Sequence, residues 1–202
     1  MKLSVLFCVF FSITGAQAQE IDFSALDLAV RPLSLVNWKV GETADFDVSL
    51  GSFGSVGTLV KAVTKEDSSV DGVWVSSEAN LMGQKDSSEM LISRSSGEVL
   101  KYIHNGKEEA VPANDIEVVK TERVEVDVPA GHFKAYHLVV NTKDVKGIEI
   151  WVNPKDTVME GTLKQTVPNQ MGLVEVVLTK FHKVTMRTFP WPCDICFCDI
   201  DQ

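Results

Sequence analysis

Cysteine is missing from almost the whole chain of 202 residues. The 4 cysteines are Cys8 and a group of three close to the C-terminus, so the body between them has no disulfide framework. Small animal secreted domains commonly depend on such a framework. No asparagine is followed two positions later by serine or threonine, so an N-glycosylation acceptor is also missing. Together the two absences favour a bacterial periplasm over an animal extracellular space.

Motifs of known catalytic sites are absent as well. There is no Gly-x-Ser-x-Gly nucleophile elbow. The glycine-rich stretch 51–57 lacks the Lys-Ser/Thr of a phosphate-binding loop and is expected to open a strand rather than a helix. The histidines fall on separate predicted strands and turns: His104, His132, His137 and His182. Their separation favours surface or structural roles over a metal site. We therefore expect a protein that is not an enzyme and that carries no cofactor.

Basic residues are outnumbered, with 19 Lys and Arg against 28 Asp and Glu, for a formal net charge of -9. Such an acidic chain is repelled by phosphate backbones and by anionic membrane surfaces. We therefore exclude nucleic acid as a partner. The acidic residues are scattered along the sequence, which favours a solvated surface over an acidic binding patch.

A hydrophobic run long enough to cross a bilayer is also lacking. Lys2 precedes an apolar run from Leu3 to Ile13, which is well short of the roughly 20 residues that a spanning helix needs. Ala16-Gln-Ala18 has the Ala-x-Ala form of a cleavage site. We expect residues 1–18 to be a cleaved secretory signal peptide. The mature protein is then periplasmic and does not span the membrane.

Alternation of apolar and polar residues with a period of two dominates the rest of the chain. Val124, Val126 and Val128 share one face of a predicted strand, and Glu125 and Asp127 share the other. Similar segments are 44–50, 57–64, 73–77, 99–103, 132–140, 148–152, 158–165 and 174–179. Short strands with one polar face are typical of antiparallel sheets. The pattern predicts a mainly β, antiparallel meander that forms a single domain over residues 19–188.

Turn signals agree with a meander. Asn105-Gly106 is the strongest two-residue hairpin signal, because both turn positions need a positive φ. Val128-Pro-Ala-Gly131 predicts another turn, with a positive φ at Gly131. Helical signals are few and short, and we expect helices only at 23–30 and 84–93.

Aromatic residues lie on or beside the predicted strands. Four of them are candidate ligand-binding residues: Trp74, Tyr102, Phe133 and Trp151. One interpretation places them in the core of a barrel or sandwich. The other places them around an apolar cavity, since barrels of this size can hold one small ligand.

Three segments resemble a recurring signature of bacterial exported proteins. They are Val128-Pro-Ala-Gly-His-Phe133, Ile150-Trp-Val-Asn-Pro154 and Val167-Pro-Asn-Gln-Met-Gly-Leu-Val174. Together with residues 38–42, they are similar to periplasmic proteins related to the lipoprotein-localisation factors (LolA/LolB-like). The resemblance spans residues 38–181. It implies an unclosed, strongly curved half-barrel with few short helices, apolar inside, that binds acyl chains or lipid-modified partners.

Three functions remain open from the sequence. The first is a periplasmic, non-enzymatic binding protein for a hydrophobic small molecule or acyl chain. The second is a structural or assembly component that contacts another envelope protein, with the cavity filled by side chains. The third is a metal- or thiol-handling protein that acts through the C-terminal tail.

The Cys/Pro-rich tail, residues 189–202, contains Cys193, Cys196 and Cys198. An odd number of exported cysteines leaves one thiol after a disulfide forms, so we expect a disulfide-linked dimer or a mixed disulfide. One alternative is a soft metal ion bound by the three thiolates, although three cysteines are an incomplete structural zinc set. The other is an inert tail.

Overall fold

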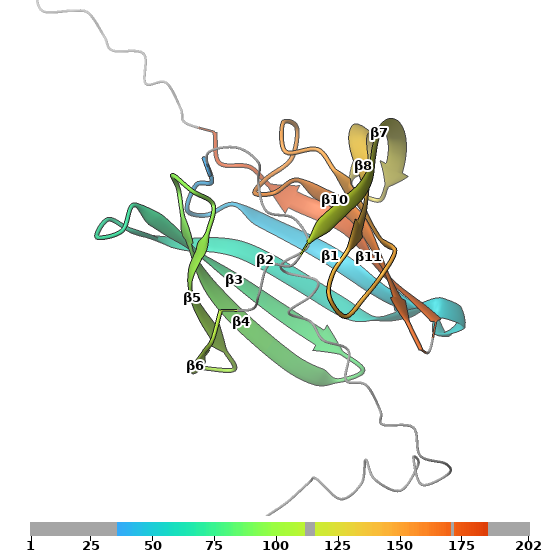
Figure 1. Ribbon diagram of the computed structural model, residues 1–202, viewed down its shortest axis with the longest axis horizontal. Helices are drawn as coiled ribbons and strands as arrows, with labels where there is room; N and C mark the ends of the chain where they lie inside the picture. Colours follow the sequence, from blue (N-terminus) through green and yellow to red (C-terminus); the bar gives the residue numbers. More distant parts are fainter. Residues whose placement is uncertain (1–35, 112–115, 171, 186–202) are drawn as a thin grey trace, which may run out of the picture.

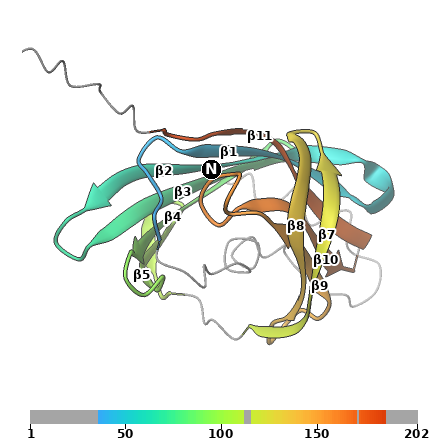
Figure 2. The ribbon, with the colours of Figure 1, turned by 90° about the horizontal axis from the view of Figure 1, so that it is seen from above.

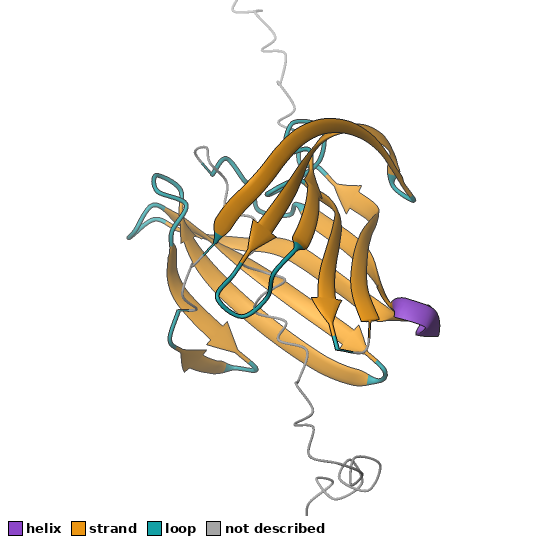
Figure 3. Ribbon diagram, turned by 45° about the vertical axis from the view of Figure 1, so that its right-hand side comes forward, coloured by secondary structure: helices purple, strands orange, loops and turns teal. Residues whose placement is uncertain are grey.

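The computed structural model describes residues 36–111, 116–170 and 172–185, which form one antiparallel sheet of 11 strands (Figure 1). The strands are β1 (Thr43–Leu50), β2 (Ser55–Asp67), β3 (Gly72–Leu81), β4 (Gln84–Ser93), β5 (Val99–His104), β6 (Lys107–Glu109), β7 (Glu117–Val128), β8 (Gly131–Asn141), β9 (Ile148–Val152), β10 (Thr162–Asn169) and β11 (Gly172–His182). A single turn of 3-10 helix, η1 (Gly51–Phe53), follows β1 (Figure 3). The mainly β prediction is therefore confirmed.

The sheet consists of two meanders joined in the middle. Its strand order is β6-β5-β4-β3-β2-β1-β11-β10-β9-β8-β7. Every pair except β1–β11 joins strands that are neighbours in the sequence, as hairpin-connected strands are. The edge strands β6 and β7 follow each other in the chain but lie at opposite edges of the sheet. The sheet curves strongly without closing between these two edges (Figure 2), which confirms the predicted unclosed half-barrel.

Two turns match their sequence signals. Asn105 and Gly106, between β5 and β6, have φ values of 48° and 76°, as a two-residue hairpin with positive φ at both positions requires. Gly131 opens β8 with a φ of 142°. This value confirms the positive φ predicted at Gly131. Residues with a side chain rarely adopt this backbone conformation, which explains the glycine.

The helix predicted at 84–93 is wrong. That segment is β4, and it pairs with β3 from Leu81↔Gln84 to Gly72↔Ser93 without a shift in register. Met82 and Gly83 have positive φ values of 50° and 80° and form the two-residue turn that returns the chain along β3. This local turn and the continuous ladder override the apolar run in β4. The other predicted helix, 23–30, lies outside the described residues.

The alternation in β7 is confirmed by the exposure of its side chains. Val128 is buried, Val124 and Val126 are half-buried against the core, and Glu125 and Asp127 are exposed. The turn between β7 and β8 contacts β11 of the same meander, because the Ala130 N–H donates to the Leu178 carbonyl oxygen over 3.3 Å. The valine face of β7 thus packs against the core near the hairpin tip, and further along the strand the same face carries Glu122.

We predict that Val126→Asp lowers the free energy of unfolding by about 1–3 kcal/mol, because it places a charge against the core without a partner. Glu125→Ala, on the exposed face, changes it by less than about 0.5 kcal/mol. Urea unfolding of both variants measures the difference. Equal losses in the two variants would contradict the face assignment.

Candidate functional site

The inner face of the sheet is the set of side chains that lie on the same side as Phe46 and Val48 of β1. Strand registers carry this face from Val48 to Val176 of β11, and from there through β10 to Ile150 of β9. In the other direction it reaches Val75 of β3 and Met90 of β4. Its most deeply buried members are each less than 2 % exposed: Val48, Leu50, Val63, Val73, Val140, Ile148, Ile150, Leu163, Val174 and Leu178. Apolar side chains therefore line this face in both meanders.

A row of polar side chains interrupts the apolar surface in the N-terminal meander. Lys61 of β2 is opposite Ser77 of β3, Ser77 is opposite Ser88 of β4, and Ser88 is opposite His104 of β5. The first three members of this polar row are buried. Lys61 Nζ lies 3.1 Å from Glu160 Oε1, in an ion pair whose side chains are only 8 % and 10 % exposed. A charge this deeply buried needs such a partner.

His104, at the end of the polar row, is tied to acidic side chains. Its Nε2 lies 2.8 Å from Asp86 Oδ1, and its Nδ1 lies 3.6 Å from Glu109 Oε1. The Asn105 amide also donates to Asp86 over 2.8 Å. The hydrogen bond with Asp86 raises the pKa of His104 above its ordinary value of 6.5.

Gln165 of β10 is the second polar feature of the inner face. It lies opposite Ile150 of β9 and Val176 of β11, and it is 3 % exposed. Its Nε2 is buried without a hydrogen-bond partner. Sequence reasoning missed this residue, although the alternation of Leu163, Gln165 and Val167 places it on an apolar face.

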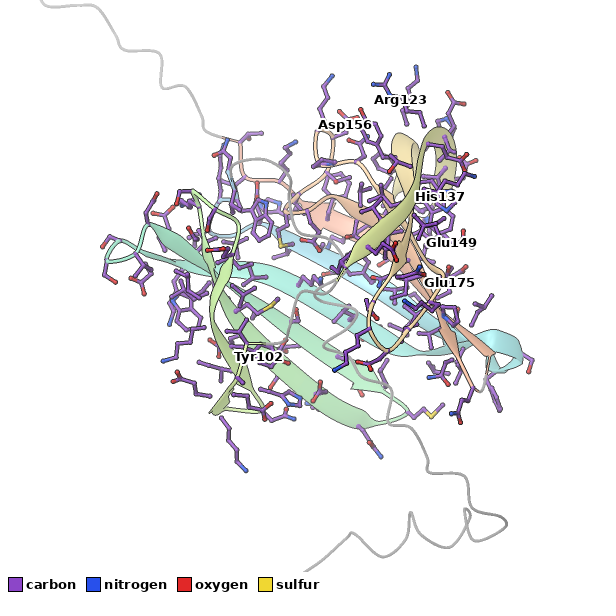
Figure 4. The ribbon with its side chains drawn as sticks, viewed as in Figure 1. Tyr102, Arg123, His137, Glu149, Asp156 and Glu175 are labelled. Carbon is purple, nitrogen blue, oxygen red and sulfur yellow. The ribbon has the colours of Figure 1, made fainter. Side chains whose placement is uncertain are left out.

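The opposite, outer face carries a cluster of charged residues around His137 of β8. Its Nδ1 lies 2.9 Å from Glu122 Oε1 of β7, and its Nε2 lies 2.8 Å from Glu149 Oε2 of β9. The imidazole stacks on Trp151 with a centroid distance of 4.4 Å and an interplanar angle of 11°. Lys164 Nζ lies 5.4 Å from the centroid of the same indole. We call these five residues the outer cluster; Figure 4 shows His137 and Glu149 far from Tyr102.

The outer cluster fits a structural tie between β7, β8 and β9. Both ring nitrogens of His137 lie within hydrogen-bond distance of a carboxylate oxygen, one on β7 and one on β9, so the imidazole joins these two strands through β8. The hydrogen bond with His137 is the main cause that lowers the pKa of Glu122, and Lys120 adds to it. The two carboxylates bind opposite ring nitrogens, so the three side chains do not converge on one point. Among the described residues, no group of three acidic, histidine or cysteine side chains could hold a metal ion.

Of the four aromatic candidates, Tyr102 lies on the inner face. It is 5 % exposed, is opposite Met90 of β4, and stacks on His104 with a centroid distance of 6.2 Å. Phe133 lies near the tip of the β7–β8 hairpin, beyond the part of β8 that pairs with β9. There it packs against the core, with its ring centroid 6.4 Å from that of Phe181.

The other two candidates lie on the outer face. Trp74 is opposite Leu91 of β4, with Lys65 Nζ 4.5 Å from the centroid of its indole. Trp151 belongs to the outer cluster and has the opposite orientation to its neighbour Ile150. Tyr102 is nevertheless a member of the main core cluster, and Phe133 and Trp151 both pack against that cluster, whereas Trp74 does not. Their role in ligand binding stays a prediction.

Cys193, Cys196 and Cys198 lie outside the described residues, as does the whole tail. The disulfide and the metal site expected there remain predictions. No helix of the described residues is long and apolar enough to cross a membrane.

No protein-family model matches the chain, and no curated protein matches it in sequence. Similar solved structures include one described as an exported protein with a YmcC-like fold from Bacteroides fragilis, with a TM-score of 0.42 and 14% identity over 74% of this chain and 99% of that one. Another is described as a lipoprotein from Parabacteroides distasonis, with a TM-score of 0.40 and 12% identity over 74% and 98%. Similarity at this level assigns neither a family nor a function.

The His104–Asp86 pair predicts a pH dependence of stability. Because the folded-state pKa of His104 is raised, its contribution is fully present below pH 6.5 and is lost as the pH rises through the raised pKa. We expect Asp86→Asn to destabilise the protein more at pH 5.5 than at pH 9, measured by urea unfolding. In a His104→Gln background, the effect of Asp86→Asn should be the same at both pH values. A pH-independent loss in the single variant would rule out the linkage.

Proposed function

We propose that the protein is a periplasmic, non-enzymatic binding protein that holds an apolar or acylated ligand against the inner face of its curved sheet. The observation that carries this proposal is the continuity of the apolar inner face across the β1–β11 joint, in a sheet that does not close. A concave apolar surface with few polar groups is typical of small-molecule binding sites.

The edges of the sheet support a route to the inner face. Strands β6 and β7 are not paired with each other, whereas a closed barrel would seal its interior with a continuous ladder. β6 has only three residues, all exposed, and two of them are acidic. Such a short, charged edge resists pairing with another strand, which keeps the sheet open.

The outer cluster favours binding over catalysis. The hydrogen bonds of His137 go to two carboxylates, and its ring is stacked on Trp151. A general base needs a hydrogen-bond position that faces the proton it removes, and both nitrogens of this imidazole are already occupied. The cluster therefore supplies rigidity to the C-terminal meander.

A structural or assembly role is the second candidate. The near-complete burial of the inner face favours it, since a packed interior leaves no room for a ligand. In that case the envelope partner would contact the outside of the sheet. The metal- or thiol-handling function depends on the tail alone.

We expect purified mature protein to increase the fluorescence of diphenylhexatriene in a saturable way, because this hydrocarbon dye emits strongly only in apolar surroundings. Palmitate should displace the dye, and lipid extraction followed by mass spectrometry should identify a copurified ligand. Dye binding with no displacement, or no binding by protein that shows a cooperative thermal transition, would favour the assembly role.

Two neighbouring positions on β3 locate the site. Ala79 is on the inner face, opposite Leu59, and is 7 % exposed, whereas Asn80 is exposed on the outer face. Ala79→Phe should weaken dye binding at least several-fold by filling the inner face, and Asn80→Phe should leave it unchanged. Thermal unfolding of both variants checks that each is folded.

A further inference from the structure

Gln165 differs from the other buried polar side chains in having an unsatisfied donor. Its Nε2 is the one buried side-chain nitrogen or oxygen without a hydrogen-bond partner among the residues that the structure describes. Asn153 offers a contrast, since its amide nitrogen donates to the Lys134 carbonyl and to Asp156 over 2.9 and 2.8 Å. Burial alone therefore does not leave an amide unpaired in this fold.

An unpaired amide at this position destabilises the fold. Leaving a buried donor unsatisfied costs about 1–3 kcal/mol, whereas a leucine or methionine would fill a similar volume without that loss. A single buried water is a poor hydrogen-bond acceptor for Gln165 Nε2, because such a water itself needs two to four polar partners. The cross-strand neighbours of Gln165 on the inner face are Ile150 and Val176, which offer no polar side chain. Folding alone gives no reason for a glutamine here.

The surroundings also indicate the kind of acceptor that would fit. The nearest lysine in sequence, Lys164, points to the other face, where it lies over Trp151 and pairs with Glu175. A carboxylate beside Gln165 would thus be buried without that cation, which is costly. A neutral carbonyl oxygen accepts a hydrogen bond without bringing a charge. The apolar neighbours suit the hydrocarbon chain attached to such a group.

We propose that Gln165 Nε2 donates a hydrogen bond to the carbonyl oxygen of a neutral acyl ester bound on the inner face. This inference rests on the proposed function and specifies its ligand class as esterified acyl chains, in preference to free fatty acids or plain hydrocarbons. Gln165 then fixes the position of the ester between the apolar side chains of Ile150 and Val176, which alone would let the chain slide.

The test compares two displacing ligands of equal heavy-atom count, methyl laurate, which carries an ester carbonyl, and pentadecane, which does not. With diphenylhexatriene bound to the full mature chain, Gln165→Leu should weaken displacement by methyl laurate about tenfold, as expected for the loss of one buried hydrogen bond. Displacement by pentadecane should be unchanged or stronger. The control Thr166→Val removes a polar group from the next position, on the other face, and should change neither. Laurate as a third displacing ligand should bind more weakly than its methyl ester to the wild-type protein.

Stability gives an independent readout. Removing an unsatisfied donor should leave the free energy of unfolding of Gln165→Leu unchanged or higher. A loss of folding in both Gln165→Leu and Gln165→Met would show a structural role and overturn the inference. Equal weakening of methyl laurate and pentadecane, or no weakening of either, would overturn it while the proposed function stands. Failure of wild-type protein to bind the dye would overturn both.

Discussion

The pairing of β1 with β11 is the interaction on which the rest of the structure depends. All other ladders join consecutive strands, so each meander is held by local hairpins, and only this ladder makes them one sheet. It runs from Thr43↔His182 to Leu50↔Val174, with one irregularity between Asp45 and Phe46. The same register aligns Phe46 with Leu178 and Val48 with Val176. A shift by one residue would turn one of the two apolar faces outward and divide the inner face.

Polar side chains find their hydrogen-bond partners in different ways on the two faces of the sheet. On the outer face, the charged side chains around His137 satisfy one another, and the cluster ties three strands together at the edge of the C-terminal meander. On the inner face, Lys61 is matched by Glu160 from the loop between β9 and β10, which links the two meanders across the sheet. The unpaired amide of Gln165 is informative by comparison, because even the buried charge of Lys61 has a partner in this fold.

Local pattern was enough to predict the main turns and most of the strands, since alternation and the Asn105-Gly106 signal depend on neighbours in sequence. It placed one strand at 158–165, whereas β10 runs from Thr162 to Asn169. It failed at β4, where the apolar Met90-Leu91-Ile92 suggested a helix although Leu91 turns towards Trp74 on the outer face. The candidate aromatics were chosen by residue type without regard to face. Trp151 alternates with Ile150, so the sequence already placed these two side chains on opposite faces of β9. The same alternation places Gln165 on the inner face. That its amide nitrogen has no hydrogen-bond partner depends on the packing of distant strands, which the sequence does not show.

The strand order also has a consequence for how the chain could be divided. Between β6 and β7 the chain passes from one edge of the sheet to the other, and these two strands share no ladder. Cutting the chain there would leave every hairpin intact in one fragment or the other. The two fragments would recognise each other chiefly through β1 and β11, which is the arrangement that split-protein complementation requires. For the same reason, the association of residues 43–50 with 172–182 is the step with the largest loop-closure entropy in folding, and it is the step that such a cut would make bimolecular.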